Sequence, residues 1–327
     1  MNIRPVLLAA LVPLSACANP DAVVDPNDHA EIVFEVPSGA SGARVGTLLE
    51  EGGLVGSAWN FKQVLKADDI TCIKAGKHAI RKDMTVRELA QALCAAPIPD
   101  DVPFTVLEGW RIKDIDKALA KKGWISAGEY AALANSKEVD LPFEVSGPSL
   151  EGYLYPETYM VPPDAERFSA KRLIERQLQT FKTRFLDVHG DALGNRSLHD
   201  VVVVASMIER EEPTDKYRPV VAGIIWKRLD HDTPLGIDAT SRYQLEIWED
   251  EKAFRKVLKD PADLYGTRVR AGLPPTAIGN PTQTALEAAV KPEETEFWYY
   301  LHDREGVFHG GRNGDEHERN RAKYGVY

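Results

Sequence analysis

The chain has 327 residues, of which 43% are hydrophobic, and carries a formal net charge of −10 with an isoelectric point near 5.4. This length leaves room for two or three domains, and the hydrophobic fraction is sufficient for buried cores. The acidic balance argues against a nucleic-acid partner, since binding to phosphates requires clustered lysine and arginine side chains.

The first 18 residues have the pattern of a bacterial export signal. A basic start with Arg4 precedes an apolar stretch over 6–14, which is too short to span a bilayer. The Leu-Ser-Ala-Cys that follows resembles a lipobox, so Cys17 is the predicted lipidation site. Ala-Cys-Ala at 16–18 also fits ordinary signal-peptidase cleavage, which would release a soluble protein. In both cases we expect an exported chain, and lipidation would anchor it on the periplasmic side of a bacterial membrane.

Residues 19–30 are rich in Pro, Asp and Asn, and residues 31–100 have the periodicity of a small α/β subdomain. The composition of the first segment predicts a solvated tether. In the second, apolar spacing predicts a strand over 32–36, helices near 45–49 and 59–65, and a strand near 70–80. Thr85 and Glu88 form a capping-box pattern that opens a third helix. Strand, helix, helix, strand is the order of LysM carbohydrate-binding modules, so the prediction for 31–100 is a LysM-like subdomain.

Cys72 and Cys94 both lie in this subdomain. In an oxidising compartment they can form a disulfide, although two buried free thiols fit the sequence as well. No CxxC or HxxxH spacing occurs and the eight His residues are scattered. The sequence therefore predicts no metal site, and nothing in it calls for a cofactor.

From residue 101 to residue 327 the pattern becomes mixed and rich in helices, which makes the predicted fold class α+β. Within it, residues 150–159 read LEGYLYPETY, with three Tyr and two Glu around Gly and Pro. Such a rigid, amphipathic segment suits a saccharide cleft, although it also fits a domain hinge. Glu151 and Tyr155 are the substrate-binding candidates in it.

A helix predicted to run from Leu198 to before Pro213 carries the best candidate for chemistry. Ser197 with Asp200 resembles a capping box, and the helix is almost entirely apolar before it reaches Glu209. The helical face of Glu209 also carries the apolar and small residues Val202, Ala205 and Ser206. A carboxyl on that face is partly desolvated, which favours its protonated form, as a general acid requires.

The same sequence also fits a solvated, charged helix end over residues 209–212. Glu211 projects to another side and is the weaker acid candidate, whereas Glu212 lies within one turn of Glu209 and stays a candidate. A second helix follows, with Pro219 in its first turn, and then a polar, turn-forming stretch at 233–243. That stretch is an ordinary connection or a ligand-facing loop, in which Asp238, Thr240 and Tyr243 are the candidate binding residues.

Taken in order, residues 150–159, 205–211 (ASMIERE), 235–240 (LGIDAT) and 272–275 (GLPP) resemble the endolytic murein transglycosylases, a YceG-like family. The resemblance covers nearly the whole mature chain. In that family the first Glu of the Glu-x-Glu pair after Ala-Ser is the catalytic acid/base, which carries over to Glu209. The resemblance also implies a LysM-like N-terminal subdomain and cleavage of the MurNAc-β-1,4-GlcNAc bond in nascent peptidoglycan strands, with peptidoglycan synthases as candidate partners.

A lytic transglycosylase needs only one carboxyl, because the C6 hydroxyl of the substrate itself attacks the anomeric carbon. We expect Glu209 to protonate the leaving oxygen and then to deprotonate that hydroxyl, which leaves a 1,6-anhydroMurNAc end. The residues expected to position the sugar or to orient the acid are Glu151, Tyr155, Asp238, Thr240 and Tyr243.

The chain departs from the family pattern at three places. First, a lipobox replaces the membrane-spanning N-terminal helix that is usual in the family. Second, the family's Tyr-Asn-Thr motif has Gly266 in place of its Asn. Third, the family's late His-x-Phe pattern is present only loosely, around Phe308. Two other functions fit the residues. One is a hydrolytic muramidase with Glu212 or Asp238 as its second carboxylate, and the other is a non-catalytic peptidoglycan-binding lipoprotein.

Overall fold

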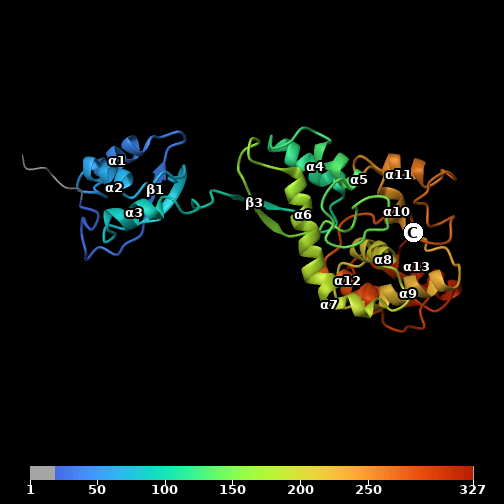
Figure 1. Cartoon of the computed structure of the whole chain (residues 1–327). Coiled ribbons are helices and arrows are strands. Elements are labelled where there is room, and N and C mark those ends of the chain that lie inside the picture. Colours follow the sequence, from blue (N-terminus) through green and yellow to red (C-terminus); the bar gives the residue numbers. More distant parts are fainter. Residues whose placement is uncertain (1–18, 327) are drawn as a thin grey trace, which may run out of the picture. The chain divides into compact units, whose positions relative to one another are not determined.

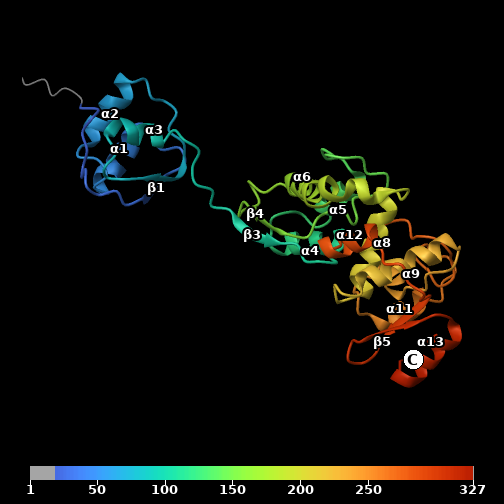
Figure 2. The same ribbon diagram turned by 90° about the horizontal axis from the view of Figure 1, so that it is seen from below.

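The computed structural model describes residues 19–326, so the predicted export signal with Cys17 lies outside the described residues. The chain divides between Asp100 and Asp101 into two compact units, which are seen in Figures 1 and 2. The described part is mixed α+β and rich in helices, with three two-stranded antiparallel sheets. None of its helices is both long and apolar enough to cross a membrane.

The first unit is built around one two-stranded sheet and three helices. Strands β1 and β2 pair antiparallel, and the inward-facing side chains of the helices form one apolar core, with Leu49, Phe61 and Leu89 fully buried. The capping box predicted for Thr85 and Glu88 is present. The elements are β1 (Ile32–Val36), α1 (Gly42–Glu51), α2 (Ala58–Ala67), β2 (Gly76–Ile80) and α3 (Val86–Ala92).

Residues 19–30, predicted to be a solvated tether, are mostly exposed, and some of their backbone groups bond to this unit. The backbone N–H groups of Val86 and Arg87 donate to the carbonyl oxygens of Ala22 and Pro20 at 3.0 and 3.1 Å. These two N–H groups belong to the first turn of α3, where helical N–H groups have no partner within the helix. The segment docks because it supplies those partners. Elsewhere in the unit a Cys72–Cys94 disulfide joins the end of α3 to the loop before β2.

The second unit is rich in helices and contains α8 (Leu198–Glu211). Its other elements are β3 (Val102–Thr105), α4 (Ile112–Lys121), α5 (Glu129–Ser136), β4 (Thr158–Val161), α6 (Ala170–Phe181), a π-helical turn (Lys182–Leu186), α7 (Asp187–His189), a 3₁₀ turn (Gly190–Leu193), α9 (Arg218–Asp230), α10 (Asp238–Arg242), α11 (Glu251–Val257), α12 (Gln283–Val290), β5 (Tyr299–His302), β6 (Phe308–Gly311) and α13 (Gly314–Tyr324).

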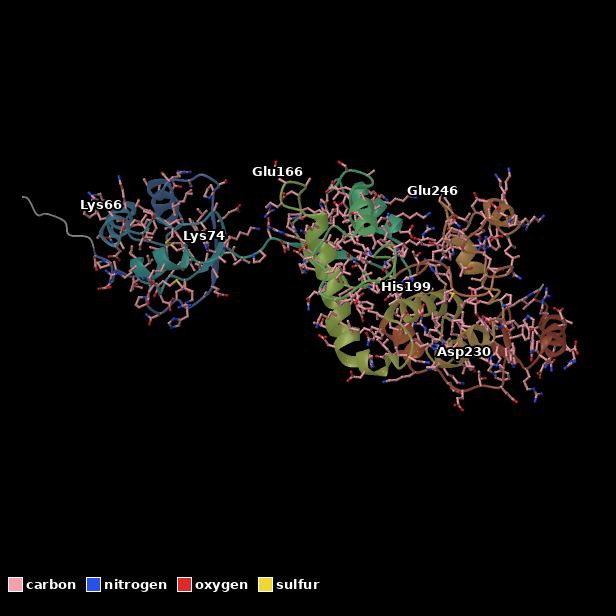
Figure 3. The ribbon with its side chains drawn as sticks, turned by 45° about the vertical axis from the view of Figure 1, so that its right-hand side comes forward. Lys66, Lys74, Glu166, His199, Asp230 and Glu246 are labelled. Atoms are coloured by element: carbon pink, nitrogen blue, oxygen red, sulfur yellow. A yellow bond between two sulfur atoms is a disulfide. The ribbon has the colours of Figure 1, made fainter. Side chains whose placement is uncertain are left out.

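Helix α8 is the central element of this unit, with α9, α10 and α12 packed against it (Figures 1 and 2). Every residue from Val201 to Ile208 is buried, which is typical of a helix that is apolar on all sides. The predicted start is confirmed, since the Ser197 hydroxyl accepts a hydrogen bond from the Asp200 N–H at 3.0 Å. His199 near the start of α8 and Asp230 at the end of α9 are labelled in Figure 3.

The stretch at 233–243 contains a short helix, α10, where the sequence showed only polar turn-forming residues. Five residues make too few internal hydrogen bonds to hold a helix by themselves. Contacts with distant residues supply the rest: the Ile237 N–H donates to the Thr267 hydroxyl at 3.0 Å, and the Thr240 hydroxyl lies 3.1 Å from the same oxygen. Tertiary contacts therefore form α10, and no local periodicity announces it.

Candidate active site

Four consecutive charged residues at the end of α8 take part in four different sets of contacts. Successive side chains on an α-helix project about 100° apart, so neighbours in sequence face different surroundings. Arg210 shows the effect most simply: its guanidinium lies 3.9 Å from the centre of the Trp248 ring and donates to the carbonyl oxygen of Gly109. The three carboxylates around it have separate partners.

Glu209 forms a nearly buried ion pair. Its side chain is 10% exposed, and that of its partner, Arg218, is 7% exposed. Arg218 nitrogens lie 3.3 Å from each carboxylate oxygen, and one oxygen also accepts from the N–H and hydroxyl of Thr282 at 2.9 and 2.5 Å. The predicted burial of its helical face is confirmed, and the interpretation of a solvated helix end is wrong for this residue. Both oxygens of Glu209, however, are engaged by other groups of the protein.

Glu211 lines a cleft of about 560 Å³ between the start of α10, strand β5 and α13. One carboxyl oxygen accepts a hydrogen bond from the Tyr300 hydroxyl at 2.9 Å. The other has no hydrogen-bond partner among residues 19–326. Burial raises the pKa of the Glu211 carboxyl above its ordinary value, the hydrogen bond from Tyr300 partly lowers it, and the charge of Asp238 raises it again. A raised pKa in a cleft is the property that a general acid requires.

The walls of this cleft combine charged and aromatic groups. Asp238 forms a two-point ion pair with Arg268, at 2.5 and 2.9 Å. The Tyr299 ring lies 4.5 Å from the Arg228 guanidinium and stacks on His317 with 5.2 Å between ring centres. The His317 Nδ1 atom is buried without a hydrogen-bond partner in the described structure. Aromatic faces beside polar groups suit a sugar ligand.

Glu212 holds the turn after α8. It is 1% exposed and accepts from the N–H and hydroxyl of Thr214 at 2.8 and 2.6 Å. Its second oxygen lies 2.8 Å from Nε2 of His302. These contacts tie the end of α8 to β5, so the structure gives Glu212 a role in holding the fold together.

The structure distributes the predicted substrate-binding residues over several places. Asp238 lines the cleft of Glu211. Tyr155 lines a different cleft of about 890 Å³, next to Arg218 and Thr282, and its hydroxyl donates to Gln283 at 3.1 Å. Glu151 and Tyr243 line a small cavity of about 190 Å³. Thr240 is fully buried, and its hydroxyl donates to the Ile237 carbonyl at 2.7 Å.

Several residues of these networks escaped the sequence analysis. Neither Tyr300 nor Arg218 was a candidate from the sequence. Asn280, fully buried in the proline-rich loop, accepts from the backbone N–H groups of Gly152 and Leu154 at 3.1 and 3.0 Å and so holds the 150–159 segment in place. An Asn beside Gly279 and Pro281 was the one available signal, because buried amides in such loops bond to the backbone.

Residues 34–323 match the model of the YceG-like family, which is most of the chain. The chain belongs to the YceG-like family. The resemblance predicted from the four motifs is thereby confirmed.

Two relatives of this chain carry the same functional name. The chain is 24% identical over 316 residues to the endolytic murein transglycosylase of Bacillus subtilis, covering 92% of this chain and 87% of the relative. It is 23% identical over 335 residues to the protein of that name from Streptococcus pneumoniae, of which it spans 60%. A crystallised YceG-like protein from Listeria monocytogenes has the same fold, with a TM-score of 0.57, 24% identity and coverage of 89% of this chain and 99% of that chain.

The Glu-x-Glu pair of the YceG-like motif therefore lies at the end of α8, with one carboxyl in an ion pair and the other in a cleft. Within residues 19–326, no three His, Cys, Asp or Glu side chains are grouped so as to hold a metal ion. The chemistry that this arrangement can perform is proton transfer by a carboxyl group.

Proposed function

We propose that this chain is an endolytic lytic transglycosylase that cleaves the MurNAc-β-1,4-GlcNAc bond of peptidoglycan strands, with Glu211 as the catalytic acid and base. The names of its relatives support the substrate and the reaction class. The observation that carries the assignment to Glu211 is its carboxyl in the cleft, with one oxygen bonded to Tyr300 and a raised pKa. Glu209, which the sequence motif favours, remains the alternative and is tested beside it.

The reaction needs one carboxyl group and no water. Protonated Glu211 donates its proton to the glycosidic oxygen as the bond from that oxygen to C1 of MurNAc breaks. The resulting carboxylate then takes the proton of the MurNAc C6 hydroxyl, whose oxygen forms the new bond to C1. The products are a GlcNAc end and a 1,6-anhydroMurNAc end, and Glu211 is protonated again. General acid and base steps of this kind contribute about 10²- to 10⁴-fold each.

Asp238 supports a second candidate function, because it brings another carboxylate to the cleft of Glu211. If Asp238 activates a water molecule, the enzyme is a hydrolytic muramidase and its products have reducing MurNAc ends. Its ion pair with Arg268 favours a role in binding the sugar, since that pair occupies both carboxylate oxygens.

Mass spectrometry of digested, uncrosslinked glycan strands tests these assignments. The protein of residues 19–327 is compared with Glu211→Gln and Glu209→Gln. We expect internal fragments with 1,6-anhydroMurNAc ends from the wild type and from Glu209→Gln, and none from Glu211→Gln. Loss of cleavage in Glu209→Gln alone would return the catalytic role to Glu209. Reducing ends would establish the muramidase, and no cleavage by the wild type would favour the non-catalytic binding lipoprotein.

We further propose that the chain is exported and lipidated at Cys17, and that residues 31–100 form a LysM-like unit that binds glycan. The order of β1, α1, α2 and β2 supports the second proposal. Peptidoglycan synthases are the candidate partners, because endolytic cleavage of nascent strands takes place where strands are made. The mass of the mature N-terminal peptide tests lipidation, with Cys17→Ser as the control; an unmodified Cys17 in the wild type would exclude it.

A further inference from the structure

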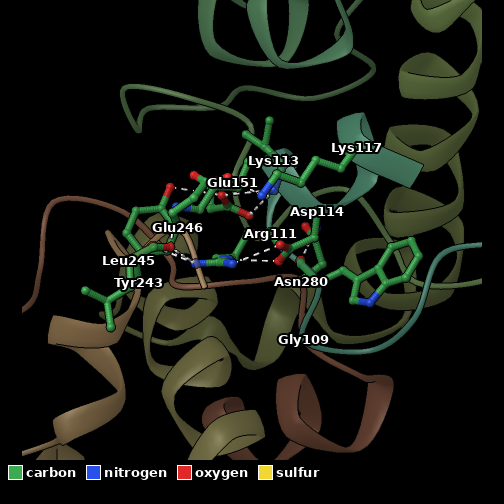
Figure 4. Close-up of polar contacts among 12 residues, drawn as sticks. Gly109, Arg111, Lys113, Asp114, Lys117, Glu151, Tyr243, Leu245, Glu246 and Asn280 are labelled. Carbon is green, nitrogen blue, oxygen red and sulfur yellow. Dashed lines mark hydrogen bonds and ion pairs between the residues drawn. The ribbon is translucent and has the colours of Figure 1, made fainter. Parts of the chain in front are cut away.

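A buried carboxylate outside the catalytic cleft connects α4 to the end of α10. Glu151 is 2% exposed, and its oxygens accept from the N–H of Ile112 at 3.1 and 3.2 Å and from the hydroxyl of Tyr243 at 2.9 Å (Figure 4). Burial raises the pKa of Glu151 to about 7. Such burial disfavours the carboxylate and costs stability, so its presence calls for a functional explanation.

Tyr243 directly follows α10 as its C-capping residue. Its ring packs on that of Tyr265 with 4.8 Å between ring centres. Arg111 donates to the carbonyl oxygens of Tyr243 and Leu245 at 3.0 and 2.7 Å, and Lys113 donates to Leu245 at 2.6 Å (Figure 4). Among these contacts, the side chain of Tyr243 makes one hydrogen bond, from its hydroxyl to Glu151. The beginning of α4 thus holds the C-terminal end of α10.

The other end of α10 reaches the cleft, because Asp238 is its first residue and lines the same cleft as Glu211. Thr267 holds this end through Ile237 and Thr240. A helix of five residues is kept in place by its tertiary contacts. Asp238 and Tyr243 therefore lie at the two ends of one short helix, whose position depends on the contacts at both ends.

We propose that Glu151 is a positioning residue for the cleavage reaction, which acts through Tyr243 and α10 to fix Asp238 beside Glu211. Glu151 itself does not touch the sugar. The inference rests on the proposed function, since it takes the cleft of Glu211 as the reaction site. The sequence left open whether Glu151 and Tyr243 position the sugar or orient the acid, and this proposal gives both an indirect role.

The test measures kcat and KM for strand cleavage by Glu151→Gln, Tyr243→Phe and the double variant, with thermal unfolding of each. We expect each single variant to lower kcat about 10-fold, less than the roughly 10²-fold attributed to a 1 Å misplacement. KM stays within about 2-fold, because no substrate contact is lost. The double variant is about as slow as the slower single one, since both substitutions break the same link.

Two variants serve as matched controls and should keep the wild-type kcat. Glu144→Gln removes an exposed carboxylate of the same unit, and Tyr153→Phe removes a buried hydroxyl that contacts His199. Glu246, labelled in Figure 3, lies further along the loop after α10, is exposed, pairs with Lys117, and is left unchanged.

Wild-type kcat in either Glu151→Gln or Tyr243→Phe would overturn the proposal, as would effects that multiply in the double variant. A rise in KM at constant kcat would also overturn it, because that result indicates direct substrate contact. If Glu151→Gln does not fold, Tyr243→Phe decides, since it removes only one hydroxyl. Failure of the wild type to cleave strands is a different outcome, which contradicts the proposed function itself.

Discussion

Glu209 and Glu211 lie two residues apart on α8, yet the carboxyl of Glu209 pairs with Arg218 and that of Glu211 faces a cleft beside Tyr300. The α-helix turns about 200° between these positions, so the two carboxyls belong to different surroundings. One is held by a guanidinium, and the other has an oxygen without a hydrogen bond to any residue of the described range 19–326. The structure thus divides the Glu-x-Glu pair into an ion-paired carboxylate and a candidate acid.

Substituting Glu209 should affect stability more than catalysis. Glu209→Gln removes the nearly buried countercharge of the Arg218 guanidinium and leaves only the exposed Asp215 carboxylate at 3.6 Å. Breaking a buried pair typically costs about 3–5 kcal/mol. We expect the free energy of unfolding to fall by about 3 kcal/mol in urea titrations. The matched control is Glu157→Gln, whose carboxylate makes an exposed pair with Arg184 at 3.5 Å and should cost under about 1 kcal/mol. Equal losses in the two variants would contradict the interpretation.

Tyr300→Phe should move the alkaline limb of the pH profile. The Tyr300 hydroxyl lowers the pKa of Glu211, so its removal raises that pKa further. The acid then keeps its proton to higher pH, and the alkaline limb of kcat/KM shifts upward. Tyr299→Phe, which changes the same cleft without a hydrogen bond to Glu211, should leave the limb in place. A downward shift or no shift in Tyr300→Phe would be evidence against Glu211 as the acid.

Glu151 makes the stability of the protein depend on pH. Its pKa is raised from 4.5 to about 7 in the folded state, so the folded state binds the proton more tightly than the unfolded state does. The stabilisation is complete below pH 4.5 and is lost as the pH rises through about 7. A difference of this size corresponds to about 3 kcal/mol. Urea titrations from pH 4.5 to 8 should show a smaller pH dependence for Glu151→Gln, and equal slopes would contradict the assignment.

Several polar and charged groups around Glu151 influence the pKa of its carboxyl, and therefore the pH dependence that the urea titrations measure. The backbone N–H of Ile112 and the hydroxyl of Tyr243 lower the pKa, as does the charge of Arg111, whereas the charge of Asp114 raises it. Arg210 from α8 also interacts with Glu151 electrostatically. The pKa of Glu151, raised to about 7, lies within the pH range of the titration.

Loss of the Cys72–Cys94 disulfide should destabilise the first unit. The bond closes a loop with a sequence separation of 22 residues. Loop-closure entropy for that length corresponds to about 3 kcal/mol. We expect Cys72→Ser with Cys94→Ser to speed limited proteolysis within 19–100 and to leave proteolysis of the second unit unchanged. Identical digestion of wild type and double variant would contradict this prediction.

The sequence by itself determined the local elements and the family. The periodic apolar residues of α8 and α9 and the capping residues Ser197 and Thr85 predicted helices that the structure contains. These signals act between residues three or four positions apart, so a single chain shows them directly. The four short motifs likewise indicated the YceG-like family, because each motif consists of consecutive residues and can be recognised in the sequence alone.

Only the tertiary structure decided what each carboxyl does. Thr282, which bonds to Glu209, is 73 residues away from it, and Tyr300, which bonds to Glu211, is 89 residues away. Helical spacing placed the two glutamates on different faces but could not say which face meets an arginine and which a cleft. The same holds for α10, whose Thr240 contacts Thr267 and whose C-capping residue Tyr243 bonds to Glu151. Burial and partners of a polar group depend on residues distant in sequence, and local periodicity carries no information about them.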